Sequence, residues 1–234
     1  MVTHRVAISQ SNYVPWRGYF DLIDSVDEFV IYDEVQFTRR DWRNRNRIKT
    51  ANGLQWLTIP VQSKGNYYAK VSEIRVDDPG WNQNHWRAIE LAYSKAEWFP
   101  TERDWLSDLY TRATFDELSR VNRHFIEAFM GKLQISTSLR DSSDFVLADD
   151  RNERLLNICI ELGATAYVSG PAAKDYLDEN LFKSHGISVE WFNYEGYEPY
   201  PQLWGDFVDG LSIVDLVLNW GPSSERFAKR EGSE

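Results

Sequence analysis

The chain has 234 residues with a 42% hydrophobic and a 15% aromatic share, which excludes intrinsic disorder and allows a large buried core. Its net charge of −10 argues against general nucleic-acid binding. No stretch approaches the roughly 18 consecutive apolar residues of a membrane span, and the first residues lack a signal-peptide pattern. We therefore expect a cytoplasmic protein, or one that acts at a membrane surface only through a partner.

The first third of the chain predicts a βαβ unit followed by a hairpin. Apolar runs bounded by polar turns predict the strands, and apolar residues at helical spacing predict the helix. In chain order, we expect strand 6–9, helix 18–26, strand 28–33, alternating strand 42–48, return strand 56–61 and edge strand 70–76. Because a helix separates the first two strands, they should be parallel. Ala51-Asn52-Gly53 supplies the hairpin turn.

The rest of the chain predicts mainly helices, with two further strands. We expect helices 81–96, 102–113 and 115–131, a helix capped by Asp149 or Asp150, strand 165–168, a helix opened by Ser169-Gly170-Pro171, strand 187–192 and helix 211–218. Gly163 fits the position just after the capped helix. The pattern favours one α/β domain over residues 1–222, with a mainly parallel sheet flanked by helices, and a charged tail at 223–234.

Basic residues gather in one segment of this acidic chain. Between Arg39 and Lys49 there are six cations and one carboxylate, a local charge of +5 that leaves −15 for the rest. In an extended segment, Arg43, Arg45 and Arg47 project from one face together with Lys49. Guanidinium groups this close repel one another unless an anion offsets them, and they bind phosphate or carboxylate bidentately. The segment predicts an anionic substrate; the alternative is ion pairing with some of the 36 acidic residues.

Two asparagines, Asn44 and Asn46, alternate with these arginines. Asparagine is depleted in strands, which favours a role in substrate binding. We expect Asn44 and Asn46 to share a face with Trp42 and Ile48. The alternative is therefore that the two amides satisfy backbone groups next to the core.

Polar side chains also follow the first two strands. After the first strand they are Gln10, Asn12 and Tyr13, with Trp16 able to stack on a ring. At the end of the second strand they are Asp33 and Gln36. In open parallel sheets, ligands bind beyond the carboxyl ends of the strands, so we expect these residues to bind substrate. Asp33 is a candidate general base; the alternative is a cap or an arginine partner.

The segment around residue 170 holds a second candidate site. Ser169 and Gly170 open a predicted helix, whose free N–H groups suit an anion, and Lys174 and Tyr176 follow. We expect Lys174 to move a proton and Ser169, Gly170 and Tyr176 to contact substrate. The alternative is a purely structural helix start.

The sequence contains no motif that identifies a cofactor or a metal ion. The four histidines and Cys159 show no ligand spacing, and Cys159 lies in the apolar stripe of a predicted helix, where a buried, inert thiol is expected. There is no Walker loop, no dinucleotide-binding GxGxxG and no G-x-S-x-G elbow.

Several motifs occur in a fixed order along nearly the whole chain. They are Gln10–Phe20, Asp33–Phe37, Arg43–Lys49, Trp56–Pro60, Asn84–Trp86, Ser169-Gly170-Pro171, Lys174–Leu177 and Leu211–Asn219. In these motifs the chain resembles the WbqC-like family, whose members often sit in bacterial gene clusters for O-antigen and other surface polysaccharides. The resemblance implies a transferase in that setting, moving an acyl or amino-acyl group to an amino sugar.

The chain departs from that family at one position. The family usually has Ile-His-Gln-Pro where this chain has Ile8-Ser9-Gln10-Ser11, and Ser9 cannot replace the proton chemistry of a histidine. More loosely, Pro15-x-x-Gly18 and Ser169-Gly170 resemble turns of nucleotidyl-transferase folds, although both signature histidines of those folds are missing. That similarity bears on the fold only.

Three functional hypotheses follow. The first is a transferase that acts on a nucleotide-linked or carrier-linked anionic substrate. The second is a non-catalytic protein of the same pathway that binds such a substrate or scaffolds other enzymes. The third is an adenylate-forming enzyme that needs ATP. The many aromatic residues, ten Trp, twelve Tyr and twelve Phe, also leave room for a homodimer interface.

Overall fold

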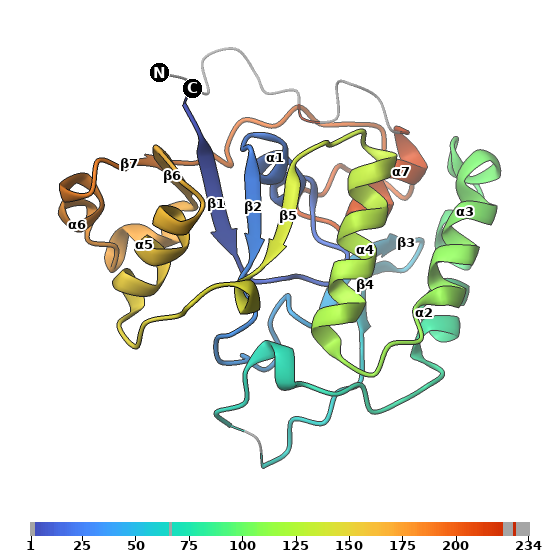
Figure 1. Cartoon of the computed structure of the whole chain (residues 1–234). Coiled ribbons are helices and arrows are strands. Elements are labelled where there is room, and N and C mark those ends of the chain that lie inside the picture. The colour runs from blue at the N-terminus through green and yellow to red at the C-terminus, as the bar shows by residue number, and fades with distance from the viewer. Residues whose placement is uncertain (1–2, 66, 222–226, 228–234) are drawn as a thin grey trace.

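The computed structural model describes residues 3–65, 67–221 and 227, and its centre is a five-stranded parallel sheet (Figure 1). The strands lie in the order β5-β2-β1-β6-β7. Their bounds are Arg5–Ser9 for β1, Glu28–Ile31 for β2, Ser138–Asp141 for β5, Ala166–Ser169 for β6 and Ser188–Trp191 for β7. A separate antiparallel hairpin joins β3 (Arg45–Thr50) to β4 (Gly53–Thr58).

Helices cover both faces of the sheet. Their bounds are Arg17–Asp24 for α1, Trp81–Tyr93 for α2, Phe99–Arg112 for α3, Leu118–Lys132 for α4, Arg151–Glu161 for α5, Glu179–Ser184 for α6 and Ile213–Asn219 for α7. Ala7 and Phe29 belong to the core that α1 and α4 cover, whereas Val6 and Val30 belong to the core that α5 and α6 cover. Alternate strand residues therefore serve opposite cores, which explains why residues 6–8 and 29–31 are apolar without alternation.

The order of the strands reverses at β1. β2 and β5 lie on one side of it, and β6 and β7 lie on the other. This is the arrangement of doubly wound folds, in which the chain turns away in opposite directions from two neighbouring strands and leaves a crevice beyond their carboxyl ends. Here those neighbours are β1 and β6, so the fold places a crevice next to Ser9 and Ser169.

The predicted α/β class with a parallel sheet flanked by helices is confirmed. The predicted parallel pairing of the first two strands is also confirmed, with Val6 opposite Glu28. Asp150 caps α5, because its carboxylate accepts hydrogen bonds from the backbone N–H groups of the second and third helical residues. Gly163 follows the helix with φ of 66°, a conformation that glycine adopts without strain.

Several elements differ from expectation. The predicted edge strand 70–76 is wrong: the segment contains the short 3-10 helix Val71–Glu73, because the Glu73 carboxylate accepts from the Lys70 N–H and closes a turn. The helix expected after Ser169-Gly170 is only the 3-10 helix Pro171–Asp175. Strand β5 was not predicted, since it has one apolar residue among four and no alternating pattern.

The described residues include no helix that is both long and apolar enough to cross a membrane. The charged tail expected at 223–234 lies, except for Phe227, outside the described residues. The division into a domain over 1–222 and a tail therefore stays a prediction.

Candidate functional site

A cavity of about 700 Å³ opens beyond the carboxyl ends of β1, β2 and β6. Its polar lining comes from the strand ends, the loops that follow them and the first turns of α5. These residues are Ser9, Gln10, Tyr32, Gln36, Thr38, Arg43, Arg151, Arg154, Tyr167, Ser169, Tyr176 and Tyr194. We call it the sheet-edge cavity. It occupies the crevice that the reversal of strand order leaves.

The strand ends form the floor of the sheet-edge cavity. Ser9 ends β1 and Ser169 ends β6, so the apolar strands give way to polar residues at the same edge. Tyr32 directly follows β2, and its backbone N–H donates to the Ser9 carbonyl at 2.8 Å. Gly170 follows Ser169, and a Cβ there would lie only 3.3 Å from the Tyr194 ring, so a larger residue would crowd that wall.

Three arginines enter the sheet-edge cavity, and no carboxylate is among the described residues that line it. Arg43 Nη1 donates to Asn12 Oδ1 at 2.6 Å and to the Ser11 carbonyl at 3.2 Å. Its nearest carboxylate is Asp41, at 3.6 Å.

The other two arginines come from α5. Arg154 Nε donates to the Ala148 carbonyl at 2.7 Å, and the Arg151 guanidinium stacks on the Tyr176 ring with its Cζ 3.3 Å from the ring centre. Neither Arg151 nor Arg154 forms a salt bridge with any described residue. Carbonyls and an aromatic ring orient the two guanidinium groups without neutralising them, so an anion placed between them would gain charge-assisted hydrogen bonds.

A tyrosine hydroxyl adds a neutral donor to the sheet-edge cavity. The Tyr32 Oη is buried and has no hydrogen-bond partner of ordinary geometry among the described residues. Burial raises the pKa of Tyr32, and the nearby Arg154 only partly opposes that effect. The phenol therefore keeps its proton at neutral pH and can donate it in a hydrogen bond to a ligand.

Asp33, a sequence-predicted catalytic residue, lies outside the sheet-edge cavity. Its buried carboxylate accepts from the Ser11 backbone N–H at 2.9 Å, from Ser11 Oγ at 2.6 Å and from Ser119 Oγ. Burial raises the pKa of Asp33, although these hydrogen bonds work in the opposite direction. It lines a smaller cavity of about 250 Å³ beside Ser119 and Arg123. The geometry shows Asp33 holding the loop after β1.

Lys174, the other predicted catalytic residue, is exposed on the 3-10 helix after Gly170 and does not line the sheet-edge cavity. Its Nζ lies 5.5 Å from the centre of the Trp191 ring. The structure therefore brings Ser169, Gly170 and Tyr176 to the cavity, but not Lys174.

Several predicted binding residues satisfy internal groups instead. Tyr13 is fully buried, and its hydroxyl bonds to His85 Nδ1 at 2.8 Å and to Tyr110 Oη at 3.0 Å. Asn44 Nδ2 donates to the Ile59 carbonyl at 2.9 Å, and Asn46 Nδ2 donates to the Val14 carbonyl at the same distance. For the two asparagines, the geometry favours the alternative interpretation, in which they satisfy backbone groups next to the core.

The cations of the basic segment lie in three different environments. Arg43 precedes β3 and reaches the sheet-edge cavity, whereas Arg45 stacks on Trp56 with its Cζ 4.1 Å from the ring centre. Arg47 lies 5.6 Å from both the Trp42 and the Trp56 rings. Lys49 is buried, with its Nζ 3.2 Å from Gln202 Oε1.

The expectation that Trp42 shares a face with the asparagines is wrong. The Trp42 ring packs on Trp56 at 5.5 Å, on the arginine face of the hairpin. The strand begins only at Arg45, so the period-two alternation does not extend back to residue 42.

Sequence reasoning missed Arg151 and Arg154. One signal was present, because both lie in the first turns of a capped helix, where the macrodipole disfavours cations. Two arginines at the start of a helix therefore indicate a role other than stabilising that helix.

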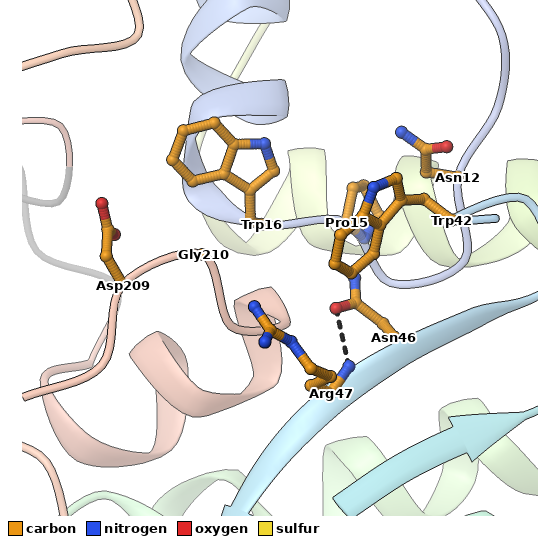
Figure 2. Close-up of a pocket in the computed structure, with 8 residues that line it drawn as sticks. All are labelled: Asn12, Pro15, Trp16, Trp42, Asn46, Arg47, Asp209 and Gly210. Carbon is orange, nitrogen blue, oxygen red and sulfur yellow. Dashed lines mark hydrogen bonds between the residues drawn. The ribbon is translucent and has the colours of Figure 1, made fainter. Parts of the chain in front are cut away.

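A second cavity of about 430 Å³ lies on the other side of the loop after β1 (Figure 2). It is lined by Asn12, Pro15, Trp16, Trp42, Asn46, Arg47, Asp209 and Gly210, and we call it the tryptophan pocket. The Arg43–Asn12 hydrogen bond and the contact between the Trp16 and Tyr194 rings, at 5.7 Å, separate it from the sheet-edge cavity.

The predicted binding residue Gln36 lines the sheet-edge cavity, where its Nε2 donates to the Tyr67 carbonyl at 2.6 Å.

Among the described residues, no group of three or more His, Cys, Asp or Glu side chains is placed to hold a metal ion.

Comparison with known proteins places the chain in a family. The model of the WbqC-like protein family matches residues 10–227. The chain is 51% identical over 225 residues to "Uncharacterized protein Rv1507c" of Mycobacterium tuberculosis (strain ATCC 25618 / H37Rv), an alignment that covers 96% of this chain and 97% of that protein. No solved structure matches the chain. With a match over nearly its whole length, the chain belongs to the WbqC-like protein family.

Proposed function

We propose that this protein binds a phosphate-bearing substrate, linked to a nucleotide or to a carrier, in the sheet-edge cavity, and that it acts in bacterial surface-polysaccharide biosynthesis. One observation carries the binding part: Arg43, Arg151 and Arg154 meet in one cavity with no carboxylate among its described lining residues. The family membership, together with the gene clusters in which such proteins often sit, supports the setting.

Physical chemistry favours an oxyanion as the ligand. Three guanidinium groups in one cavity repel one another, and a bound diphosphate would offset that repulsion while accepting bidentate hydrogen bonds. The position beyond the carboxyl ends of β1 and β6 is where doubly wound sheets bind their ligands. Gln10, Gln36 and the Tyr32 hydroxyl could then orient the uncharged part of the substrate.

We further propose that the bound substrate takes part in the transfer of an acyl or amino-acyl group to an amino sugar. Family membership is the support for this finer step. In this transfer the sugar nitrogen forms an amide bond with the acyl carbon, the bond from that carbon to the donor's carrier breaks, and the carrier leaves with the electron pair. The amine must also lose a proton. The described lining residues include no carboxylate, imidazole or ammonium group to take it. The same observation favours a second candidate function, a non-catalytic protein that holds the substrate for other enzymes.

Thermal-shift measurements test the binding step. The purified protein is screened against inorganic pyrophosphate, nucleotide sugars, coenzyme A derivatives, and ATP with and without magnesium. A ligand that binds the folded state raises the melting temperature by mass action. We expect a shift with pyrophosphate and with one nucleotide-linked class, lost in Arg154→Ala and retained in Arg45→Ala, whose guanidinium stacks on Trp56 outside both cavities. Equal shifts in both variants, or none in the wild type, would contradict the proposal.

A second measurement separates transferase from binding protein. The protein is incubated with acyl donors and nucleotide-linked amino sugars, and mass spectrometry follows the mass of the sugar. A transferase adds one acyl group per sugar, and Arg154→Ala reduces the yield. If affinity for the nucleotide sugar is retained and no product forms with any donor, the binding-protein function stands instead.

A further inference from the structure

The tryptophan pocket has rigid aromatic walls. A Cβ on Gly18 would lie 2.4 Å from the Trp16 ring, so the indole packs directly on the helix backbone and only glycine allows it. The Tyr197 ring meets Trp16 edge to face at 5.6 Å. On the opposite side, Trp42 is 38% exposed and rests on Trp56. Two indoles with open surface are therefore fixed before any ligand binds.

Three polar side chains of the tryptophan pocket, those of Asn12, Arg47 and Asp209, retain hydrogen-bonding capacity for a ligand. The Arg47 guanidinium makes no hydrogen bond or salt bridge to any described residue, and its Nε is buried without a partner. Asn12 uses its Oδ1 to accept from Arg43, which leaves its amide N–H groups for a ligand. Asp209 forms a salt bridge with the buried Arg17 at 3.6 Å, but its side chain is 56% exposed, so the carboxylate can still accept a hydrogen bond from a ligand. Asn46 is already committed, because its Oδ1 accepts from the Arg47 backbone N–H (Figure 2).

The balance of charge in the tryptophan pocket points to a neutral ligand. One guanidinium and one carboxylate line it, whereas the sheet-edge cavity has three guanidinium groups and no carboxylate among its described lining residues. A phosphate would gain from Arg47 but would be repelled by Asp209. A ring with a flat apolar face and hydroxyls around its edge fits better, since the face can pack on an indole while the hydroxyls meet both donors and acceptors.

We infer that the tryptophan pocket is a saccharide subsite that binds one neutral pyranose unit. The apolar C–H face of the sugar stacks on Trp42 or Trp16. Its hydroxyls donate to Asp209 and accept from Asn12 and Arg47.

The tryptophan pocket adjoins the sheet-edge cavity, so a sugar bound there could belong to the proposed substrate. The biological setting of this inference rests on the proposed function. Asn12 touches both cavities, because it lines the tryptophan pocket and accepts from Arg43 of the sheet-edge cavity. A phosphate-bearing group on one side and a sugar on the other would therefore meet across the Arg43–Asn12 contact. The tryptophan pocket is then where the neutral sugar part of a conjugate would lie.

Fluorine NMR locates sugar binding at named tryptophans. The protein is labelled with 5-fluorotryptophan, the Trp16 and Trp42 resonances are assigned from Trp16→Phe and Trp42→Phe, and glucose, galactose, rhamnose and N-acetylglucosamine are titrated to millimolar concentrations. We expect at least one sugar to shift both resonances while the buried Trp81 resonance stays in place. Arg47→Ala should weaken the apparent affinity by roughly fivefold, the effect of one lost hydrogen bond. Arg45→Ala is the matched control and should not change it.

Three results would overturn the saccharide subsite. They are no shift at Trp16 and Trp42 with any sugar, shifts of the same size in Arg47→Ala, and shifts that uridine or adenosine reproduces without a sugar, which would identify a nucleobase site. Pyrophosphate titrated into the same sample keeps the two proposals apart. If Arg154-dependent pyrophosphate binding persists while sugars fail, only the saccharide subsite is lost. If sugars bind while pyrophosphate fails, the proposed function is contradicted and the subsite stands.

Discussion

Arg43 and Arg47 are four residues apart, yet their side chains enter cavities of different character. Arg43 joins Arg151 and Arg154 in the sheet-edge cavity, held by carbonyl and amide oxygens. Arg47 lies against two indoles, in a pocket that also contains Asp209, the salt-bridge partner of Arg17. The same side chain thus serves two kinds of recognition, and its neighbours decide which. A count of arginines along the sequence could not separate the two.

The loop after β1 divides the two cavities, and Asp33 is its main anchor. Asp33→Ala would leave the Ser11 N–H and two serine hydroxyls without their acceptor. We expect the free energy of unfolding to fall by about 2–4 kcal/mol, as measured by urea denaturation. Asp33→Asn keeps one acceptor oxygen and should lose less. If Asp33→Ala unfolds like the wild type but abolishes product formation, Asp33 is catalytic after all.

Lys174→Ala is the control for the loss of stability in Asp33→Ala. Because Lys174 is exposed and lines neither cavity, we expect its stability to stay within about 0.5 kcal/mol of wild type.

Removing one arginine should affect the two cavities unequally. Arg154→Ala deletes a charge-assisted interaction with phosphate, which corresponds to about 1.5–3 kcal/mol, or roughly 10-fold to 150-fold in affinity. Sugar binding in the tryptophan pocket should stay unchanged. Isothermal titration calorimetry with pyrophosphate and fluorine NMR with sugars measure the two effects. An equal loss in both would mean that the cavities form a single site.

The core around Tyr13, whose hydroxyl bonds to His85, should weaken in acid. Burial lowers the pKa of His85 to about 4, so the folded protein keeps this imidazole neutral in a pH range where the unfolded chain protonates it. Between pH 6.5 and pH 4, the free energy of unfolding should therefore fall with decreasing pH, by up to about 1.4 kcal/mol per pH unit from this group. Denaturation curves of wild type and His85→Gln should converge as the pH falls; parallel curves would contradict the assignment.

A weaker effect on both ligands is expected at Asn12, the contact that the two cavities share. Asn12→Ala removes the acceptor of the Arg43 hydrogen bond and also one donor of the tryptophan pocket. Pyrophosphate and sugar should each bind roughly threefold to fivefold more weakly. Pyrophosphate loses the hydrogen bond that orients Arg43, and the sugar loses one hydrogen-bond donor. An effect on only one ligand would show that Asn12 serves a single cavity.

Much of the fold could be predicted because strand and helix patterns are local. Apolar runs located β1, β2, β6 and β7, and the cap at Asp150 located α5. Strand β5 has no such pattern, because three of its four residues are polar and only its pairing with β2 makes it a strand.

The candidate site was less predictable because it depends on which loops meet. Gln10, Gln36, Arg43 and Tyr176 reach the sheet-edge cavity as expected from strand ends and turns. Arg151 and Arg154 come from a helix more than a hundred residues away from Gln10, Gln36 and Arg43 in sequence, and only the strand order brings it alongside. Asn44 and Asn46 match a binding pattern, but nearby carbonyls use their amides.

Phosphate binding in the sheet-edge cavity can be measured by calorimetric titration with pyrophosphate on wild type, Arg154→Ala and Arg45→Ala. Pyrophosphate carries the charge common to nucleotide-linked and carrier-linked substrates without their remaining chemistry. The two variants remove the same side chain, one from the sheet-edge cavity and one from the Trp56 stack. We predict saturable binding that Arg154→Ala weakens at least roughly 10-fold and Arg45→Ala leaves unchanged. No binding to the wild type, or an equal loss in both variants, would contradict the account.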